Sequence, residues 1–134
     1  MISGETQLRV RYAETDQMGV VYYGNYPMYY EVGRTELIRE FGLTYRSLEE
    51  YGIIMPVVYL KCKYKKPAFY DDLISIHTQV PEMPGVRIRF EDQLYNQKGD
   101  LINTGSTELV FMDDRKNRPC KPPEFFIDTI KSYF

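Results

Sequence analysis

After about residue 51 the hydrophobic spacing of this chain changes from the period of an α-helix to the period of β-strands, and this change constrains the fold more than any other feature. From about Asn25 to Gly42, apolar residues recur every three or four positions, which predicts one amphipathic helix. Its apolar face comprises Tyr26, Tyr29, Tyr30, Gly33, Leu37 and Phe41. Asn25 is expected to cap the start of the helix, Pro27 falls in its first turn, and Gly42 is expected to end it.

Most of the remaining chain alternates apolar and polar residues with a period of two, which predicts strands. The predicted strands are Thr6–Tyr12, Ile53–Lys66, Leu73–Val80, Val86–Asn96 and Leu101–Met112. The other predicted elements are a short turn or helix (Thr44–Tyr51), a hairpin turn (Lys98–Asp100), a proline-rich loop (Arg118–Pro123) and a short helix (Glu124–Tyr133). One early helix followed by hairpin-linked strands predicts an α+β fold, in which an antiparallel sheet covers a single long helix.

The length and composition of the chain narrow its class. With 134 residues and no repeat, low-complexity tract or linker, it is expected to form one domain spanning residues 1–134. A net charge of −2 provides no basic surface for nucleic acid, and no apolar run approaches the ~20 residues of a membrane span. Cys62 and Cys120 fit no metal spacing, and no signal-peptide pattern is present, so we expect a cytoplasmic protein. The 13 tyrosines and a sheet that one helix only partly covers favour a homo-oligomer.

One stretch of the chain, residues 12–26, combines the features of a chemical site. Asp16 lies in the loop Ala13–Tyr23, directly before the predicted helix, and Gly19 and Gly24 allow tight backbone geometry on either side of it. Free backbone N–H groups and the positive end of the helix dipole make such a helix start favourable for negative charge. A carboxylate beside these donors can attack a carbonyl, or activate water against it, while the developing oxyanion points at the helix start.

This stretch resembles the 4-hydroxybenzoyl-CoA thioesterase-like branch of the hotdog family. The resemblance starts with Thr15-Asp16-x-x-Gly19-Val20-Val21-Tyr22 and Asn25-Tyr26, and continues with Tyr30-Glu31 and Arg34-Thr35-Glu36 on the predicted helix. It then includes Pro67-Ala68, Tyr70-Asp71-Asp72-Leu73, Gly105-x-Thr107 and Phe111-x-Asp113. A single D-x-x-G would be a weak signal, but this ordered series extends from Thr6 to about Ile130 and is a strong one.

The resemblance implies a hotdog fold, in which a five-stranded antiparallel sheet wraps a long helix, and dimers whose sheets join edge to edge, often with tetramers above them. It implies hydrolysis of an acyl-CoA thioester, with Asp16 as nucleophile or general base and the backbone N–H of Tyr23 polarising the thioester carbonyl. Many close relatives carry histidine at the position of Tyr23, so a backbone donor is retained here but an imidazole is not. Because a thiolate with a pKa of about 8.5 leaves without a general acid, this chemistry requires no metal and no cofactor.

Further binding residues follow from the same comparison. Thr15 is expected either to orient Asp16 or simply to close the turn. The predicted substrate-binding residues beside Asp16 are Gly19, Val20, Tyr22, Asn25 and Tyr26. The phosphates of CoA need cations, and Lys116 and Arg118 are the favoured candidates, because relatives bind the nucleotide near the rim at that end of the sheet. Arg115 belongs to the same favoured loop set. The other candidates are Arg87 and Arg89 on one strand and Lys61, Lys63 and Lys65 on another, and each of the three sets is more often a solvated surface.

Several rival interpretations stay open at this point. Taken alone, a loop residue such as Asp16 is most often a turn or cap residue. Glu31 and Glu36 on the helix could supply the base, as in another hotdog branch, but ion pairing along the helix is their commoner role. His77, the single histidine, lies mid-strand, which argues against a hydratase or dehydratase and against a metal site. The sequence also leaves open a binding module without turnover, an acyl-carrier-protein thioester as substrate, and the identity of the acyl group.

Overall fold

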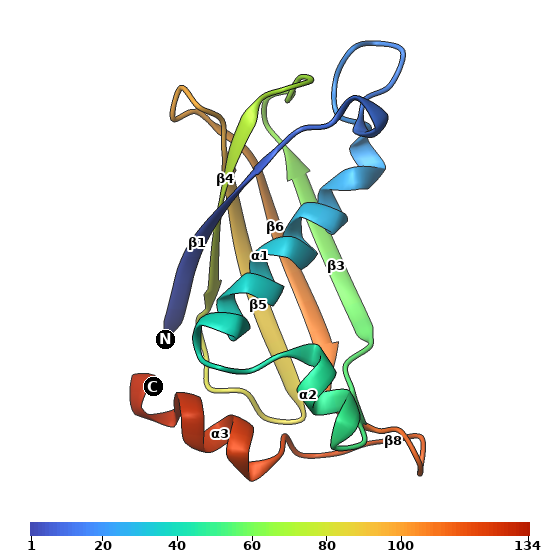
Figure 1. Ribbon diagram of the computed structural model, residues 1–134, viewed down its shortest axis with the longest axis vertical. Helices are drawn as coiled ribbons and strands as arrows, with labels where there is room; N and C mark the ends of the chain where they lie inside the picture. The colour runs from blue at the N-terminus through green and yellow to red at the C-terminus, as the bar shows by residue number, and fades with distance from the viewer.

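The computed structural model describes all residues from Met1 to Phe134 as one long helix laid across a curved sheet (Figure 1). The sheet has five antiparallel strands in the order β1-β4-β5-β6-β3. These strands are β1 (Ile2–Arg9), β3 (Val57–Tyr64), β4 (Leu73–Val80), β5 (Arg87–Tyr95) and β6 (Leu101–Val110). The long helix is α1 (Tyr26–Glu40), and it contacts all five strands. The α+β hotdog arrangement implied by the sequence is therefore confirmed.

Short elements close both ends of this layer. Single 3-10 turns, η1 (Tyr12–Glu14) and η2 (Tyr23–Asn25), precede α1, and α2 (Tyr45–Glu50) follows it. A small second sheet joins β2 (Ile53–Ile54), β7 (Met112–Asp113) and β8 (Arg118–Pro119) in the order β2-β7-β8. The chain ends with α3 (Glu124–Ile130) and η3 (Lys131–Tyr133). None of these helices has the length and apolar character needed to cross a membrane.

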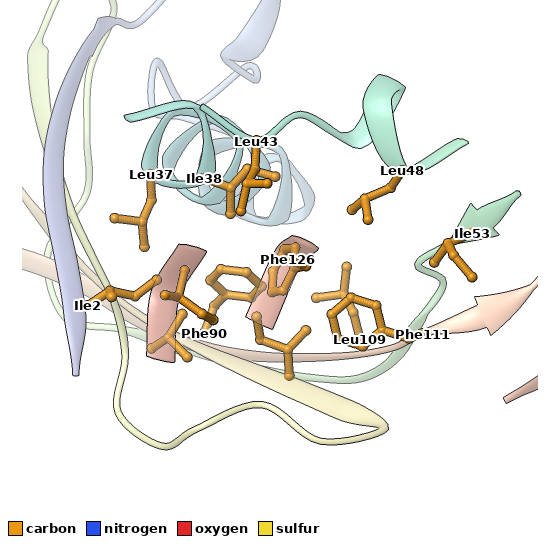
Figure 2. Packing of buried hydrophobic residues seen from close by; sticks show 13 residues of the cluster. Ile2, Leu37, Ile38, Leu43, Leu48, Ile53, Phe90, Leu109, Phe111 and Phe126 are labelled. Carbon is orange, nitrogen blue, oxygen red and sulfur yellow. The ribbon is translucent and has the colours of Figure 1, made fainter. Parts of the chain in front are cut away.

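The apolar side chains under α1 form two clusters. The larger one fills the end of the fold near α2 and α3, where Leu37 and Ile38 of α1 face Phe90 and Leu109 of the sheet, with Phe126 of α3 packed against them (Figure 2). The smaller one lies under the first turns of α1 and supports the loop that carries Asp16. Its members are Val10, Val21, Tyr26, Tyr29, Tyr30, Ala68, Ile74, Ile76, Leu94 and Ile102.

Glycine allows α1 to approach the sheet closely at one point between these clusters. A Cβ atom at Gly33 would lie 2.4 Å from Oγ1 of Thr78 and 2.7 Å from Cγ2 of Ile76. Oγ1 of Thr78 donates a 2.6 Å hydrogen bond to Asp92, and both residues are buried. The helix therefore rests directly on a polar pair in the middle of the sheet, and any side chain at this position would force the two layers apart.

The strand boundaries differ from the prediction in three places. β1 begins at Ile2 and ends at Arg9, earlier than predicted, because the chain turns into η1 at Tyr12. The predicted strand over residues 53–66 is two strands, β2 and β3, separated at Pro56, which lacks a backbone N–H for a sheet ladder. The predicted strand over residues 101–112 also divides, because Phe111 leaves the ladder and donates its N–H to the carbonyl of Val86 at 2.9 Å.

The two ends of α1 behave differently from each other. Asn25 occupies the N-cap position, but its side chain makes no capping bond, so the predicted cap is wrong. Its Nδ2 donates instead to the backbone carbonyl of Glu14 at 2.9 Å. Gly42 ends the helix as predicted, with a φ of 76°, while Leu43 and Gly42 donate to the carbonyls of Ile38 and Arg39 in a Schellman motif.

Candidate active site

The loop that carries Asp16 is a tight turn held by its own backbone. The N–H of Gly19 donates to the carbonyl of Asp16 at 2.9 Å, and the N–H of Asp16 donates to the carbonyl of Val20 at 2.9 Å. Oδ1 of Asp16 accepts a 2.8 Å bond from the N–H of Met18. Gly19 has a φ of 80°, which the turn requires and which other residues adopt only with strain. Oδ2 of Asp16 has no hydrogen-bond partner in the chain, so half of this carboxylate is free to act on a ligand.

The N-terminal end of α1 supplies free donors close to this turn. Neither the N–H of Tyr23 nor that of Gly24 has an acceptor within the chain, because both open the 3-10 turn η2. The carbonyl of Tyr23 accepts a 2.9 Å bond from the hydroxyl of Tyr64 on β3, which fixes this peptide relative to the sheet. The N-terminus of α1 adds positive dipole potential to these two N–H groups.

A buried carboxylate, Glu14, anchors the loop from below. It accepts hydrogen bonds from the N–H and Nε of Arg11 at 3.0 and 2.9 Å, and from the hydroxyl of Tyr29 on α1 at 2.8 Å. Burial raises the pKa of Glu14, but these three donors more than offset it and leave the pKa below its ordinary value. The Glu14 carbonyl also accepts the N–H of Tyr22 at 2.9 Å. Glu14 therefore connects the Asp16 loop to α1, a role that its place in the sequence did not indicate.

Asp16 and Tyr23 line one pocket of about 330 Å³. Its remaining lining residues are Met18, Val20, Val21, Tyr26, Tyr64, Lys65, Lys66 and Pro67. Lys65 was one of the candidate cations for the CoA phosphates, whereas Tyr64, Lys66 and Pro67 were not predicted as site residues. They reach the loop because Val21 donates its N–H to the carbonyl of Ala68 at 2.8 Å and Val20 forms a β-bridge with Phe69. Burial raises the pKa of the Tyr26 phenol, so this side chain is neutral at physiological pH. The pocket is thus mainly apolar, with one carboxylate and one free N–H on its wall and two lysines at its side.

The other predicted site residues are divided between this pocket and more distant places. Val20 and Tyr26 line the pocket, whereas Gly19, Tyr22 and Asn25 lie beside it without lining it. Thr15 donates its hydroxyl to the carbonyl of Tyr12 at 2.7 Å, so this hydroxyl closes the turn and does not hydrogen-bond to the Asp16 carboxylate. Lys116 and Arg118 lie at β8, at the end of the fold opposite to the Asp16 loop (Figure 1). They therefore do not reach the Asp16 pocket of the same chain.

The alternative candidates lie outside the pocket. His77 is on the outer face of the sheet, 3.5 Å from Oε1 of Glu5, and its ring packs on Tyr95. Nε of Arg39 pairs with Glu36 at 3.4 Å, but the corresponding pair between Glu31 and Arg34 does not form. The structure brings together no group of three or more His, Cys, Asp or Glu side chains that could hold a metal ion.

The chain is similar to known proteins in both sequence and structure. Residues 10–130 match the thioesterase-like superfamily. The chain is 35% identical over 127 residues to YneP of Bacillus subtilis, covering 95% of this chain and 92% of that protein. It is 30% identical over 124 residues to the acyl-CoA thioester hydrolase YbgC of Escherichia coli, covering 92% of each. The crystal structure of a DHNA-CoA thioesterase from Staphylococcus aureus superposes with a TM-score of 0.92 at 38% identity, covering 99% of this chain and 89% of that one.

Proposed function

The chain belongs to the thioesterase-like superfamily and is a thioester hydrolase, and we propose that it cleaves acyl-CoA with Asp16 as its catalytic carboxylate. One observation carries the assignment of the residue: Asp16 and Tyr23 line the same pocket, where Oδ2 of the first and the N–H of the second have no partner in the chain. A nucleophile or base and an oxyanion donor are the two groups that acyl transfer requires.

The chemistry has two forms that use the same atoms. In the first, Oδ2 of Asp16 attacks the thioester carbonyl carbon, the C–S bond breaks, CoA leaves as the thiolate, and water then hydrolyses the acyl-Asp16 anhydride. In the second, Asp16 takes a proton from water as the water oxygen adds to the carbonyl carbon, and the thiolate leaves in the same way. In both, the N–H of Tyr23 donates to the carbonyl oxygen as it becomes an oxyanion, which supplies roughly 10²–10³ in rate.

The exposed edge of the sheet supports a dimer. β3 is an edge strand of eight residues, and its large apolar side chains are about half exposed (Val57 49%, Val58 48%, Tyr59 50%, Leu60 44% and Tyr64 54%). A long apolar edge strand is prone to pair with another strand unless it is covered. We assign β3 as the edge along which two copies join by two-fold antiparallel pairing, which extends the sheet across both copies.

Thiol release from a panel of aromatic and aliphatic acyl-CoAs tests the function. The wild type is expected to release CoA. Asp16→Asn is expected to release it roughly 10²–10⁴-fold more slowly, because the amide neither attacks the carbonyl carbon nor accepts a proton from water. Asp114→Asn, which changes an exposed carboxylate in the β7–β8 hairpin, is the matched control and should keep the wild-type rate.

Three outcomes separate the competing functions. Near-full activity in Asp16→Asn would refute the role of this residue. Release from acyl-carrier-protein thioesters but not from any acyl-CoA would change the carrier and keep the chemistry. Stoichiometric acyl-CoA binding without any thiol release would point to a binding module and would contradict the proposal.

A further inference from the structure

One hydrogen bond ties the start of α1 to the edge of the sheet. The hydroxyl of Tyr64, the last residue of β3, donates to the backbone carbonyl of Tyr23 in η2 at 2.9 Å. A regular α-helix would pair this carbonyl with the N–H of residue 27, but Pro27 has no N–H. The side chain of Tyr64 therefore supplies, from the sheet, a donor that the helix backbone lacks at this position.

The residue held by this bond is the proposed oxyanion donor. Tyr23 lines the Asp16 pocket, and its N–H has no acceptor within the chain. Its own side chain does little to fix its backbone, because Tyr23 is 63% exposed and its ring packs 4.6 Å from the ring of Tyr22, which is also exposed. A hydrogen bond to the carbonyl of Tyr23 restrains rotation about its backbone bonds, and with it the direction in which its N–H points.

The position of the Tyr64 ring is itself well defined. The ring lies edge-on to that of Tyr26, at an interplanar angle of 78° with the centroids 5.4 Å apart, which is an arrangement that aromatic pairs prefer. Tyr26 begins α1 and is almost fully buried, and both rings line the Asp16 pocket. Packing in the pocket wall therefore places the Tyr64 hydroxyl under the Tyr23 carbonyl.

The ionisation of Tyr64 suits a hydrogen-bond donor. The neighbouring Cys62 thiol and, after it, burial raise the pKa of the Tyr64 phenol to about 12. The phenol therefore keeps its proton at physiological pH and can donate it to the Tyr23 carbonyl. Because a thiolate leaves without a general acid, hydrolysis does not need this proton for the leaving group.

We propose that Tyr64 is a positioning residue for thioester hydrolysis, whose hydroxyl holds the backbone of Tyr23 so that its N–H faces the thioester carbonyl. This inference rests on the proposed function and deepens it by assigning a residue that acts through the oxyanion donor. Tyr64 forms and breaks no bond in the reaction. It sets how well the N–H of Tyr23 is aligned with the carbonyl oxygen as that oxygen gains charge.

The first test measures kcat and KM of Tyr64→Phe with benzoyl-CoA and hexanoyl-CoA, as aromatic and aliphatic probes. Phenylalanine keeps the ring in the pocket wall and removes only the hydroxyl. A well-placed oxyanion donor supplies roughly 10²–10³ in rate, and a misaligned one forfeits part of it. We expect kcat to fall roughly 10- to 100-fold with both probes, while KM stays within about threefold of the wild type.

The matched control is Tyr59→Phe. It removes a hydroxyl from the same strand at a tyrosine of nearly the same exposure (50%, against 54% for Tyr64), and it should keep the wild-type kcat. A kcat of Tyr64→Phe within about twofold of the wild type would overturn the proposal. A raised KM with an unchanged kcat would also overturn it, because Tyr64 would then contact the substrate without positioning Tyr23.

The infrared band of the bound thioester carbonyl reports the alignment itself. The slow variant Asp16→Asn holds the probe, labelled with ¹³C at the carbonyl, long enough for its spectrum to be recorded. A hydrogen bond from the N–H of Tyr23 should lower the stretching frequency of this carbonyl relative to the free probe. In Asp16→Asn/Tyr64→Phe the band should move back toward the free frequency, and an unchanged band would refute the positioning role.

The pH dependence of kcat separates positioning from proton donation. Since the Tyr64 hydroxyl transfers no proton, the pH profile of Tyr64→Phe should keep the shape of the wild-type profile at a lower rate. An alkaline limb present in the wild type and absent in Tyr64→Phe would make Tyr64 an acid and would overturn the proposal.

The proposed function and this inference fail in different ways. If the wild type releases CoA from neither probe nor from the rest of the acyl-CoA panel, the proposed function fails. If Asp16→Asn loses hydrolysis while Tyr64→Phe keeps the wild-type kcat, only the role of Tyr64 is refuted.

Discussion

Removing the hydroxyl of Tyr29 should destabilise the protein at the point where the Asp16 loop joins α1. This hydroxyl is buried and donates a 2.8 Å hydrogen bond to Oε1 of Glu14, whose carboxylate is almost fully buried. Hydrogen bonds to charged groups contribute roughly 1.5–3 kcal/mol each. Tyr29→Phe should therefore lower the free energy of unfolding by about that amount. Tyr51→Phe, at a tyrosine that is 64% exposed and makes no hydroxyl bond, is the control and should change little.

Urea unfolding of a double-mutant cycle measures this bond directly. The cycle combines Tyr29→Phe with Glu14→Gln, which keeps the shape of the side chain but removes its charge. We expect a coupling free energy of roughly 1.5–3 kcal/mol. A coupling free energy below about 0.5 kcal/mol, within the additivity of independent sites, would refute the account of how the loop is anchored.

The pH dependence of Glu14→Gln provides a second check on the same contact. The pKa of Glu14 in the folded state is below its ordinary value, so its ionised form stabilises the folded protein. That stabilisation is present above the unfolded pKa of about 4.3 and is lost as the pH falls through the folded pKa. The difference in unfolding free energy between the wild type and Glu14→Gln should therefore shrink as the solution is acidified below about pH 4.

Other perturbations test the fold and the interface. Burial raises the pKa of Asp92 to about 7, so the contribution of this carboxyl to stability falls as the pH rises from its unfolded pKa of about 4 to about 7. The unfolding free energy of Asp92→Asn should therefore increase relative to that of the wild type by roughly 2–4 kcal/mol across that window. A difference in unfolding free energy that does not depend on pH would contradict this. Gly33→Ala should cost roughly 1–3 kcal/mol in urea unfolding because its Cβ would meet Thr78 and Ile76, whereas Gly85→Ala, with no atom within 4 Å of the new Cβ, should not. Val58→Lys should place like charges across a β3 dimer, so light scattering should report 15.9 kDa for the variant and twice that mass for the wild type; equal masses would exclude β3 as the interface.

The strand pattern was predictable because one face of the sheet is buried and the other is exposed. In β4, Ile74, Ile76 and Thr78 face α1 while His77 faces outward, which is the alternation that the sequence shows. The beginning of β1 was missed because Ser3, Gly4 and Glu5 carry no apolar residue to continue that alternation. It belongs to the sheet through pairing with β4, from Ile2 with Val80 to Arg9 with Leu73, which no local pattern reveals.

The same distinction applies to the candidate site. Asp16, Gly19 and Tyr23 lie in one continuous loop before a helix, so the sequence groups them, while their roles come from the family resemblance and stay predictions. Glu14 could not, since its importance comes from a hydrogen bond to Tyr29, which lies 15 residues later in the chain. The lysines at the pocket could not be placed either, because the end of β3 reaches the loop only through the contacts of Val20 and Val21.

The position of a charge in the helix was the other feature that sequence could not settle. A helical arginine three residues after a glutamate predicts a surface ion pair, and Arg39 follows that rule with Glu36. Arg34 does not, because its face of α1 is turned toward α2 and the sheet, where it is buried, makes no ion pair with Glu31, and instead interacts with the buried carboxyl of Asp92. Local spacing fixes which residues share a helix face, but tertiary packing decides which face is covered.

A single-turnover measurement tests the central claim most directly, because it separates chemistry from substrate binding and CoA release. With enzyme in excess over a rapidly hydrolysed acyl-CoA, the rate of thiol release is compared between the wild type and Asp16→Asn at saturation. The account predicts a rate lower by roughly 10²–10⁴ in the variant, with half-saturation at an enzyme concentration close to that of the wild type. An Asp16→Asn rate within about threefold of the wild type at saturation would contradict it.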